Sequence, residues 1–284
     1  MRKIEIQLDD ETSTPGDTVK GQVLITCDDD FQCERLYISL YGRELARVVI
    51  HAGKVTIVHE DKHELVDEII ELGVSLAIPM GESRFDFSFT LPANSSGSYK
   101  GAYGSIKYSL KAKAEISWAR DLKSEQEILV GFLQDVNGET IPESASDVIE
   151  RDGVLLLRVE SDRTRFFLGD DLGFRFMVDR DTKMRGVRAE IVGVEYVEPK
   201  GHKMTTKKSL AEIYFQEDEL RRDSWNEVLI PTSLDWIESF TSEVIEYKHI
   251  LKVTLDIARR PDNDIEISVI LGRSSVYKKS EFDY

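Results

Sequence analysis

Two stretches of strict alternation between apolar and polar residues constrain the fold of this chain more than any other feature. From Phe85 to Leu91 every second residue is apolar, and the same period runs from Ile106 to Ile116. A period of two places one face of a strand in a core and the other in water, as in an antiparallel sheet that is packed on one side. Pro92 ends the first stretch because its nitrogen cannot donate to a ladder. The chain is therefore predicted to be all-β.

The second half of the chain repeats the strand signals of the first half. A shift of 153 residues places Gly16 on Gly169, and a shift of 139 residues places Tyr108 on Tyr247, the two shifts differing through loop length. A shared order of signals predicts two copies of one sandwich. We expect tandem immunoglobulin-like β-sandwich domains over residues 1–133 and 153–284, joined by a turn-rich linker over residues 134–152.

The charge balance excludes one class of partner. Among 284 residues, 53 are acidic and 37 are basic, so the formal net charge is −16 at pH 7. Nucleic acid requires a basic surface and is not an expected partner. No apolar segment is long enough for a transmembrane helix, and no signal peptide follows Met1. Cys27 and Cys33 are too few for a disulfide framework, so we expect free thiols and a cytoplasmic protein, with pairing of these two left open.

The residues around the first alternating stretch resemble the N-terminal domain of the arrestin family. The pattern Gly-x-x-x-Phe-x-Phe-x-Phe-x-Leu-Pro begins at Gly81, and Ser-Tyr-Lys-Gly-Ala-Tyr-Gly-Ser-Ile-Lys-Tyr begins at Ser98. A Pro-Gly-Asp turn at Pro15 is similar to the turn that opens arrestin N-domains, and Leu155–Leu172 resembles the opening strands of arrestin C-domains. Trp118 resembles the aromatic residue that ends an alpha-arrestin strand, and we expect it at the sandwich rim. The alpha-arrestins and the arrestin-like subunit of retromer are the closest branches.

The resemblance implies a non-enzymatic adaptor or scaffold that binds other proteins in intracellular trafficking or signalling. Its partners would be acidic or phosphorylated segments, the tails of membrane proteins or a trafficking complex, and it would reach membranes through them. The alternative is a structural subunit of a retromer-like or coat-like assembly. The long tail of visual and beta-arrestins and the Pro-Pro-x-Tyr motif of alpha-arrestins are both missing, so release of a tail by phosphate is not expected. No cofactor is expected.

Basic residues are the candidates for partner binding, because an acidic or phosphorylated segment is attracted to the few basic places on an acidic surface. Arrestins are similar in placing basic residues on their first strand. Three groups follow from the pattern, although each could serve solubility alone. They are the strand-start pair Arg2 and Lys3, the outward stripe Lys107, Lys111 and Lys113, and the predicted loop with Lys200, Lys203, Lys207 and Lys208.

A second candidate surface lies between the apolar runs Val48–Ile50 and Val55–Val58. By resemblance to the arrestin loop that protrudes toward the partner, the contact loop is predicted to contain His51, Ala52, Gly53 and Lys54. An ordinary hairpin is the alternative.

One motif points to different chemistry. His59-Glu60-Asp61-Lys62-His63 matches His-Glu-x-x-His, in which two histidines on one helix face bind zinc and the glutamate acts as general base. A zinc hydrolase that uses His59, Glu60 and His63 is therefore a remote alternative. The surrounding pattern predicts strands and no third ligand follows at a recognisable spacing, so we expect neither a metal site nor catalytic residues.

Overall fold

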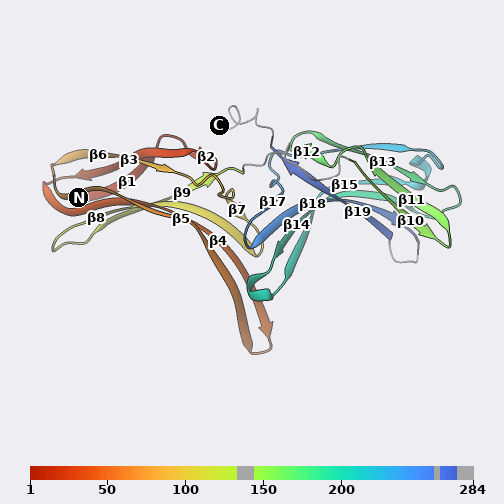
Figure 1. Ribbon diagram of the computed structural model, residues 1–284, viewed down its shortest axis with the longest axis horizontal. Coiled ribbons are helices and arrows are strands. Elements are labelled where there is room, and N and C mark those ends of the chain that lie inside the picture. Colours follow the sequence, from red (N-terminus) through yellow and green to blue (C-terminus); the bar gives the residue numbers. More distant parts are fainter. Residues whose placement is uncertain (133–143, 259–262, 274–284) are drawn as a thin grey trace. The chain divides into compact units, whose positions relative to one another are not determined.

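The computed structural model describes residues 1–132, 144–258 and 263–273 (Figure 1). Within these residues the regular structure consists of strands and two short 3-10 helices, which confirms the predicted all-β class. The chain forms two compact units. The first contains β1 to β9 and the short segments Val197–Met204 and Ser242–Ile245, and the second contains the other described strands.

The first unit is a sandwich of a three-stranded and a six-stranded sheet. The three-stranded sheet has the order β1 (Arg2–Leu8), β3 (Thr18–Cys27), β6 (Gly81–Thr90). The six-stranded sheet has the order β2 (Thr12–Ser13), β9 (Leu122–Val130), β8 (Gly104–Glu115), β4 (Phe31–Ala52), β5 (Val55–Ile78), with β7 (Tyr99–Lys100) paired to β8.

The core of this sandwich is built from the alternating stretches. β8 buries Ile106, Tyr108 and Leu110, and β6 buries Phe87 and Phe89. The Tyr108 hydroxyl donates a hydrogen bond of 2.6 Å to the Ser96 carbonyl, and burial raises the pKa of this phenol to about 12. The period-two pattern therefore identified the buried face of both strands correctly.

The second unit is built in the same way. Its smaller sheet has the order β10 (Ala145–Arg151), β11 (Val154–Ser161), β13 (Asp171–Val178), β16 (Asn226–Pro231). Its larger sheet has the order β12 (Arg165–Phe167), β19 (Asn263–Gly272), β18 (Ile245–Asp256), β14 (Gly186–Val197), β15 (Met204–Gln216), with β17 (Phe240–Thr241) paired to β18. The 3-10 helices are η1 (Pro199–Gly201) and η2 (Glu217–Glu219).

The strand orders of the two sandwiches correspond, which supports the repeat that the sequence predicts. β1-β3-β6 corresponds to β11-β13-β16, and β2-β9-β8-β4-β5 corresponds to β12-β19-β18-β14-β15. The equivalent glycines Gly16 and Gly169 have φ of 84° and 93°, a conformation that favours glycine. β10 has no counterpart. Part of the predicted linker, residues 145–151, forms this edge strand because Ala145 and Ile149 pack against the core of the second unit.

Residues 134–143 of the predicted linker lie outside the described residues, so the boundary between the domains stays a prediction. We expect limited proteolysis to cut once between the sandwiches and to leave two stable fragments. Because β10 begins at Ala145 and its backbone is paired with β11, cleavage should fall before this strand. Mass spectrometry of the fragments tests this, and a first cut inside either sandwich would contradict it.

The length of one hairpin is the feature of the first unit that the sequence pattern did not predict. β4 and β5 pair from Phe31 opposite Ile78 to Ala52 opposite Val55. β8 accompanies β4 only as far as Ala46. Residues 48–59, here called the hairpin ribbon, therefore continue as two strands beyond the sheet (Figure 1).

Candidate functional site

The outer face of the six-stranded sheet gathers basic side chains from two central strands. Lys107 and Lys111 on β8 are exposed and Lys113 is half-buried, on the outward side that alternation predicts. The register places Arg43 of β4 opposite Lys107 and Ser39 opposite Lys111. Arg43 was missed at the sequence level because only the strand register shows which residue faces Lys107. We call Arg43, Lys107, Lys111 and Lys113 the basic face.

The cations of the basic face differ in how far they are neutralised. Lys111 lies 3.3 Å from Glu125. Lys113 lies 2.7 Å from Glu115 and 3.2 Å from Asp121, and these two carboxylates raise the pKa of its ammonium group.

Arg43 and Lys107 are the members of the basic face without a close ion pair, although the register places Glu64 of β5 opposite Arg43, and Arg43 also interacts electrostatically with Glu60. In the part of the chain that the structure describes, neither has a carboxylate oxygen within 4.0 Å. Like charges on directly opposite strand positions repel each other, so this pair favours a bound anion. Tyr41 and Ser109, the next outward pair along the same strands, place two hydroxyl groups beside it.

The basic pair at the start of the first strand is partly occupied by acidic neighbours. Arg2 lies 2.7 Å from Asp29 and its guanidinium stacks 4.6 Å from the centre of the Phe31 ring, while Lys3 lies 2.6 Å from Glu5. Exposed ion pairs of this kind contribute only about 0–1 kcal/mol, so a doubly charged phosphate can compete with them. β1 is also the outer strand of its sheet.

The third predicted group does not form one loop. Lys200 lies in η1, whereas Lys207 and Lys208 lie on β15. Consecutive residues of a strand point to opposite faces, so the last two lysines are separated. Lys203 is 3.8 Å from Glu198 and Lys207 is 3.1 Å from Glu266. The prediction of a basic loop from Lys200 to Lys208 is wrong, because the strand begins at Met204.

The predicted contact loop lies at the end of the hairpin ribbon. Gly53 and Lys54 form the turn, and Gly53 has φ of 63°. A Cβ atom added to this glycine would meet open space, because no atom of a residue beyond its chain neighbours lies within 4 Å. His51 Nδ1 lies 3.1 Å from Thr56 Oγ1 across the turn. The loop thus has the exposed position expected of a contact, and its role stays a prediction.

The His-Glu-x-x-His motif lies on β5, an extended strand. At about 3.3 Å per residue, His59 and His63 are about 13 Å apart along the strand, which is too far for one zinc ion to contact both. Glu60 pairs with Lys62 at 2.7 Å and Arg47 at 3.7 Å, and the hydrogen bond from Lys62 lowers the pKa of its carboxyl group. The zinc-hydrolase alternative therefore has no geometric basis. No group of three or more metal-binding side chains occurs elsewhere in the described residues.

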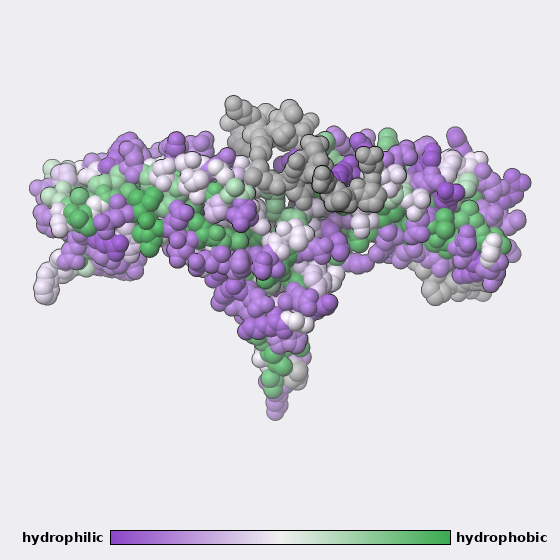
Figure 2. Space-filling model, in the orientation of Figure 1, coloured by the Kyte–Doolittle hydropathy of each residue, from purple (hydrophilic) through white to green (hydrophobic). Residues whose placement is uncertain are grey.

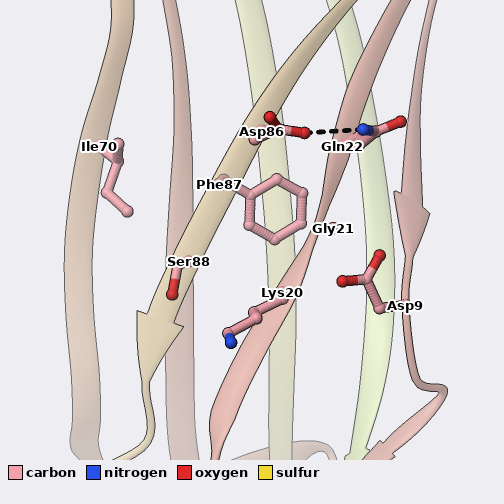
Figure 3. A pocket seen from close by; sticks show the side chains of 8 residues that line it. All are labelled: Asp9, Lys20, Gly21, Gln22, Ile70, Asp86, Phe87 and Ser88. Atoms are coloured by element: carbon pink, nitrogen blue, oxygen red, sulfur yellow. Dashed lines mark hydrogen bonds between the residues drawn. The ribbon is translucent and has the colours of Figure 1, made fainter.

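A shallow depression of about 540 Å³ lies over β3 and β6 (Figure 3). Phe87 and Ile70 provide its apolar surface, and Gln22 donates a hydrogen bond of 2.7 Å to Asp86 at its rim. Ser88 also lines it, but no histidine does. The lining therefore offers no nucleophile with a base to activate it.

Trp118 and the two cysteines complete the sequence-level candidates. Trp118 lies on the turn between β8 and β9 with φ of 58° and is fully exposed. Trp118 thus stands just beyond the end of β8, as expected of a strand-ending aromatic residue, and its indole projects into solvent. Cys27 and Cys33 are both buried and unpaired, and burial raises the pKa of the Cys33 thiol.

These observations define an all-β protein of two similar sandwiches with a basic face on the first. Residues 3–137 match the family model of the arrestin (or S-antigen) N-terminal domain, and this part of the chain belongs to that family. A relative is arrestin domain-containing protein 17 of Caenorhabditis elegans, which is 25% identical over 137 residues, covering 44% of this chain and 32% of the relative. The matched region thus spans about a third of that relative. Among the described residues, no helix is long and apolar enough to cross a membrane.

Proposed function

We propose that the protein is a non-enzymatic adaptor that binds acidic or phosphorylated segments of other proteins through its first sandwich. The match of residues 3–137 to the arrestin N-terminal domain carries this proposal, since arrestins are generally adaptors. The charges of the basic face support it. A guanidinium and an ammonium group, neither paired with a carboxylate among the described residues, lie side by side on an exposed sheet.

The Arg43–Lys107 pair suits a phosphate or a carboxylate cluster. A guanidinium presents two parallel N–H donors to such an anion, and hydrogen bonds between charged groups are about twice as strong as neutral ones. Tyr41 and Ser109 add hydroxyl donors at the neighbouring position. Arg2 and Lys3 lie on the other sheet, so they would bind a second acidic group of an extended segment.

The net charge of −16 contributes to selectivity. Most of the surface repels an acidic partner, so productive encounters concentrate at the basic places. The interaction is therefore expected to weaken as salt concentration rises, because added ions screen exposed charges beyond about 10 Å at 0.1 M.

Charge reversal tests the proposal. Replacing Arg2, Lys3, Lys107 and Lys111 together with glutamate should weaken binding of a synthetic peptide with two phosphoserines by about tenfold or more. It should also flatten the dependence of affinity on salt, measured by fluorescence anisotropy at low and high salt, because the attracting charges are gone.

A matched control reverses four basic residues of the second unit, Arg180, Lys183, Arg221 and Lys248. It changes the net charge equally and should leave binding within about twofold of the wild-type protein. If the first variant retains its fold and binds the peptide as tightly as the wild type, the sandwich edges or the second unit bind the partner instead.

A further inference from the structure

The hairpin ribbon carries the densest group of exposed apolar side chains in the part of the chain that the structure describes. Val49, Ile50, Val55, Ile57 and Val58 are each between 37% and 59% exposed. Figure 2 shows this apolar group near the end of the projecting hairpin, next to its polar tip. Exposed apolar residues that occur singly need no explanation, but a contiguous group at the end of a projecting element indicates a contact site.

The apolar side chains lie on both faces of the ribbon. Val49 is opposite Val58 and Ile50 is opposite Ile57. Because successive residues of a strand point to opposite faces, one of these pairs projects from each side. A shallow protein groove covers one face of such a ribbon and leaves the other in water. An apolar medium that surrounds the ribbon covers both.

The charge of the ribbon favours an uncharged environment. From Val49 to Val58, Lys54 is the sole Asp, Glu, Lys or Arg residue, in a chain with a net charge of −16. Lys54 lies at the turn, where its aliphatic stem can pass through an apolar layer while its ammonium group reaches a lipid phosphate. Elsewhere on β5, the exposed Ile69 and Val74 stand close to Glu68 and Glu71 and lack such an apolar group.

We propose that the end of the hairpin ribbon, residues 49–58, inserts into the interfacial layer of a lipid bilayer. Insertion must be shallow, because both edges of a two-stranded ribbon keep backbone groups that need water or another partner. The four steps from Val49 to Gly53 span about 13 Å. This is enough to place the apolar pairs at the boundary between headgroups and acyl chains, about 5–10 Å deep. This contact is separate from the proposed binding of acidic protein segments.

Vesicle binding by the full chain tests the proposal. Cys27 and Cys33 are buried, so a Thr56→Cys variant can carry an environment-sensitive fluorophore at one exposed thiol. Its emission should rise and shift to the blue with phosphatidylcholine vesicles, with or without phosphatidylserine. The unlabelled protein should float with both kinds of vesicle at about 0.1 M and about 0.5 M salt, because apolar insertion is not screened.

Paired substitutions locate the contact. Ile57→Asp with Val58→Asp places one charge on each face and should weaken vesicle binding by about tenfold or more. Ile69→Asp with Val74→Asp also adds two negative charges at exposed positions of β5. This variant should bind vesicles as the wild-type protein does. Circular dichroism and thermal unfolding should show that both variants keep the fold.

Three results would overturn the proposal. The first is no binding of the wild-type protein to vesicles, and the second is equal binding by the two double variants. The third is binding confined to phosphatidylserine vesicles and lost at the higher salt concentration, which would assign the contact to basic residues. None of these measurements includes a protein partner, so their failure would leave the adaptor proposal standing.

Discussion

Gly21→Ala should destabilise the first sandwich by about 3 kcal/mol or more. A Cβ atom at this position would lie 2.2 Å from the Gln7 carbonyl oxygen and 2.9 Å from Cζ of Phe87. The first of these atoms belongs to the backbone of β1, which pairs with β3 from Arg2 to Leu8. A backbone atom cannot move aside as a flexible side chain can, so the two strands would have to separate locally.

Calorimetry measures this effect. A loss of about 3 kcal/mol corresponds to a fall in Tm of about 10 °C for a unit of this size. Gly131→Ala is the matched control, because the nearest atom to its added Cβ is Cγ2 of Thr14 at 3.4 Å, an ordinary contact. An unchanged Tm for Gly21→Ala would show that β1 does not approach β3 as closely as described.

Acidification should destabilise the second sandwich through His249. This side chain is fully buried, and burial lowers the pKa of its imidazole from 6.5 to about 4. Its Nδ1 lies 2.8 Å from the Ser239 hydroxyl, which also accepts a hydrogen bond from Leu271 N–H. Nε2 has no hydrogen-bond partner among the described residues, so the protonated ring would hold a buried N–H group without an acceptor.

The direction in which pH changes stability follows from the difference between the pKa of His249 in the folded chain and in the unfolded chain. The unfolded chain binds a proton below pH 6.5, whereas the folded chain resists protonation until about pH 4. The stabilisation is therefore complete above pH 6.5 and is lost as the pH falls toward 4. The expected loss is about 2 kcal/mol at about pH 5 and about 3 kcal/mol at about pH 4.

A variant without this imidazole isolates its contribution. His249→Asn should lower stability at neutral pH by leaving a gap in the core, yet its free energy of unfolding should fall less between about pH 7 and about pH 5 than that of the wild type. His63→Asn replaces an exposed histidine of β5. Its free energy of unfolding should fall between the two pH values by as much as that of the wild type. Urea unfolding at the two pH values measures both, and parallel behaviour of His249→Asn and the wild type would contradict the assignment.

The sandwich architecture was predictable because it depends on local alternation. The buried positions of β6 and β8 follow from period two, and the shared strand order follows from the two offsets between the halves. The arrestin resemblance rested on residues in the same region, Gly81 to Tyr108, which lies inside the matched residues 3–137.

Features that depend on register or on strand surroundings could not be predicted from the pattern. Arg43 joins the basic face because β4 lies beside β8 in a particular register, which no local period shows. The length of the hairpin ribbon was not predicted, because a two-stranded ribbon exposes both faces and a polar residue such as His59 can occupy its strands without disturbing a core. The full exposure of Trp118 depends on the turn after β8, which has no strong sequence signal.

The two short parallel strand pairings also determine when each sandwich can close while the chain is being synthesised. Thr12 of β2 pairs with Leu129 of β9, and Arg165 of β12 pairs with Ile270 of β19. Each pairing joins the opening of a sandwich to its last strand, so neither larger sheet can be completed by local contacts alone. During translation the first sandwich can close only after Val130 has emerged, and the second only after Gly272 has emerged. Until then the early strands of each half have unpaired edges with which another chain can pair.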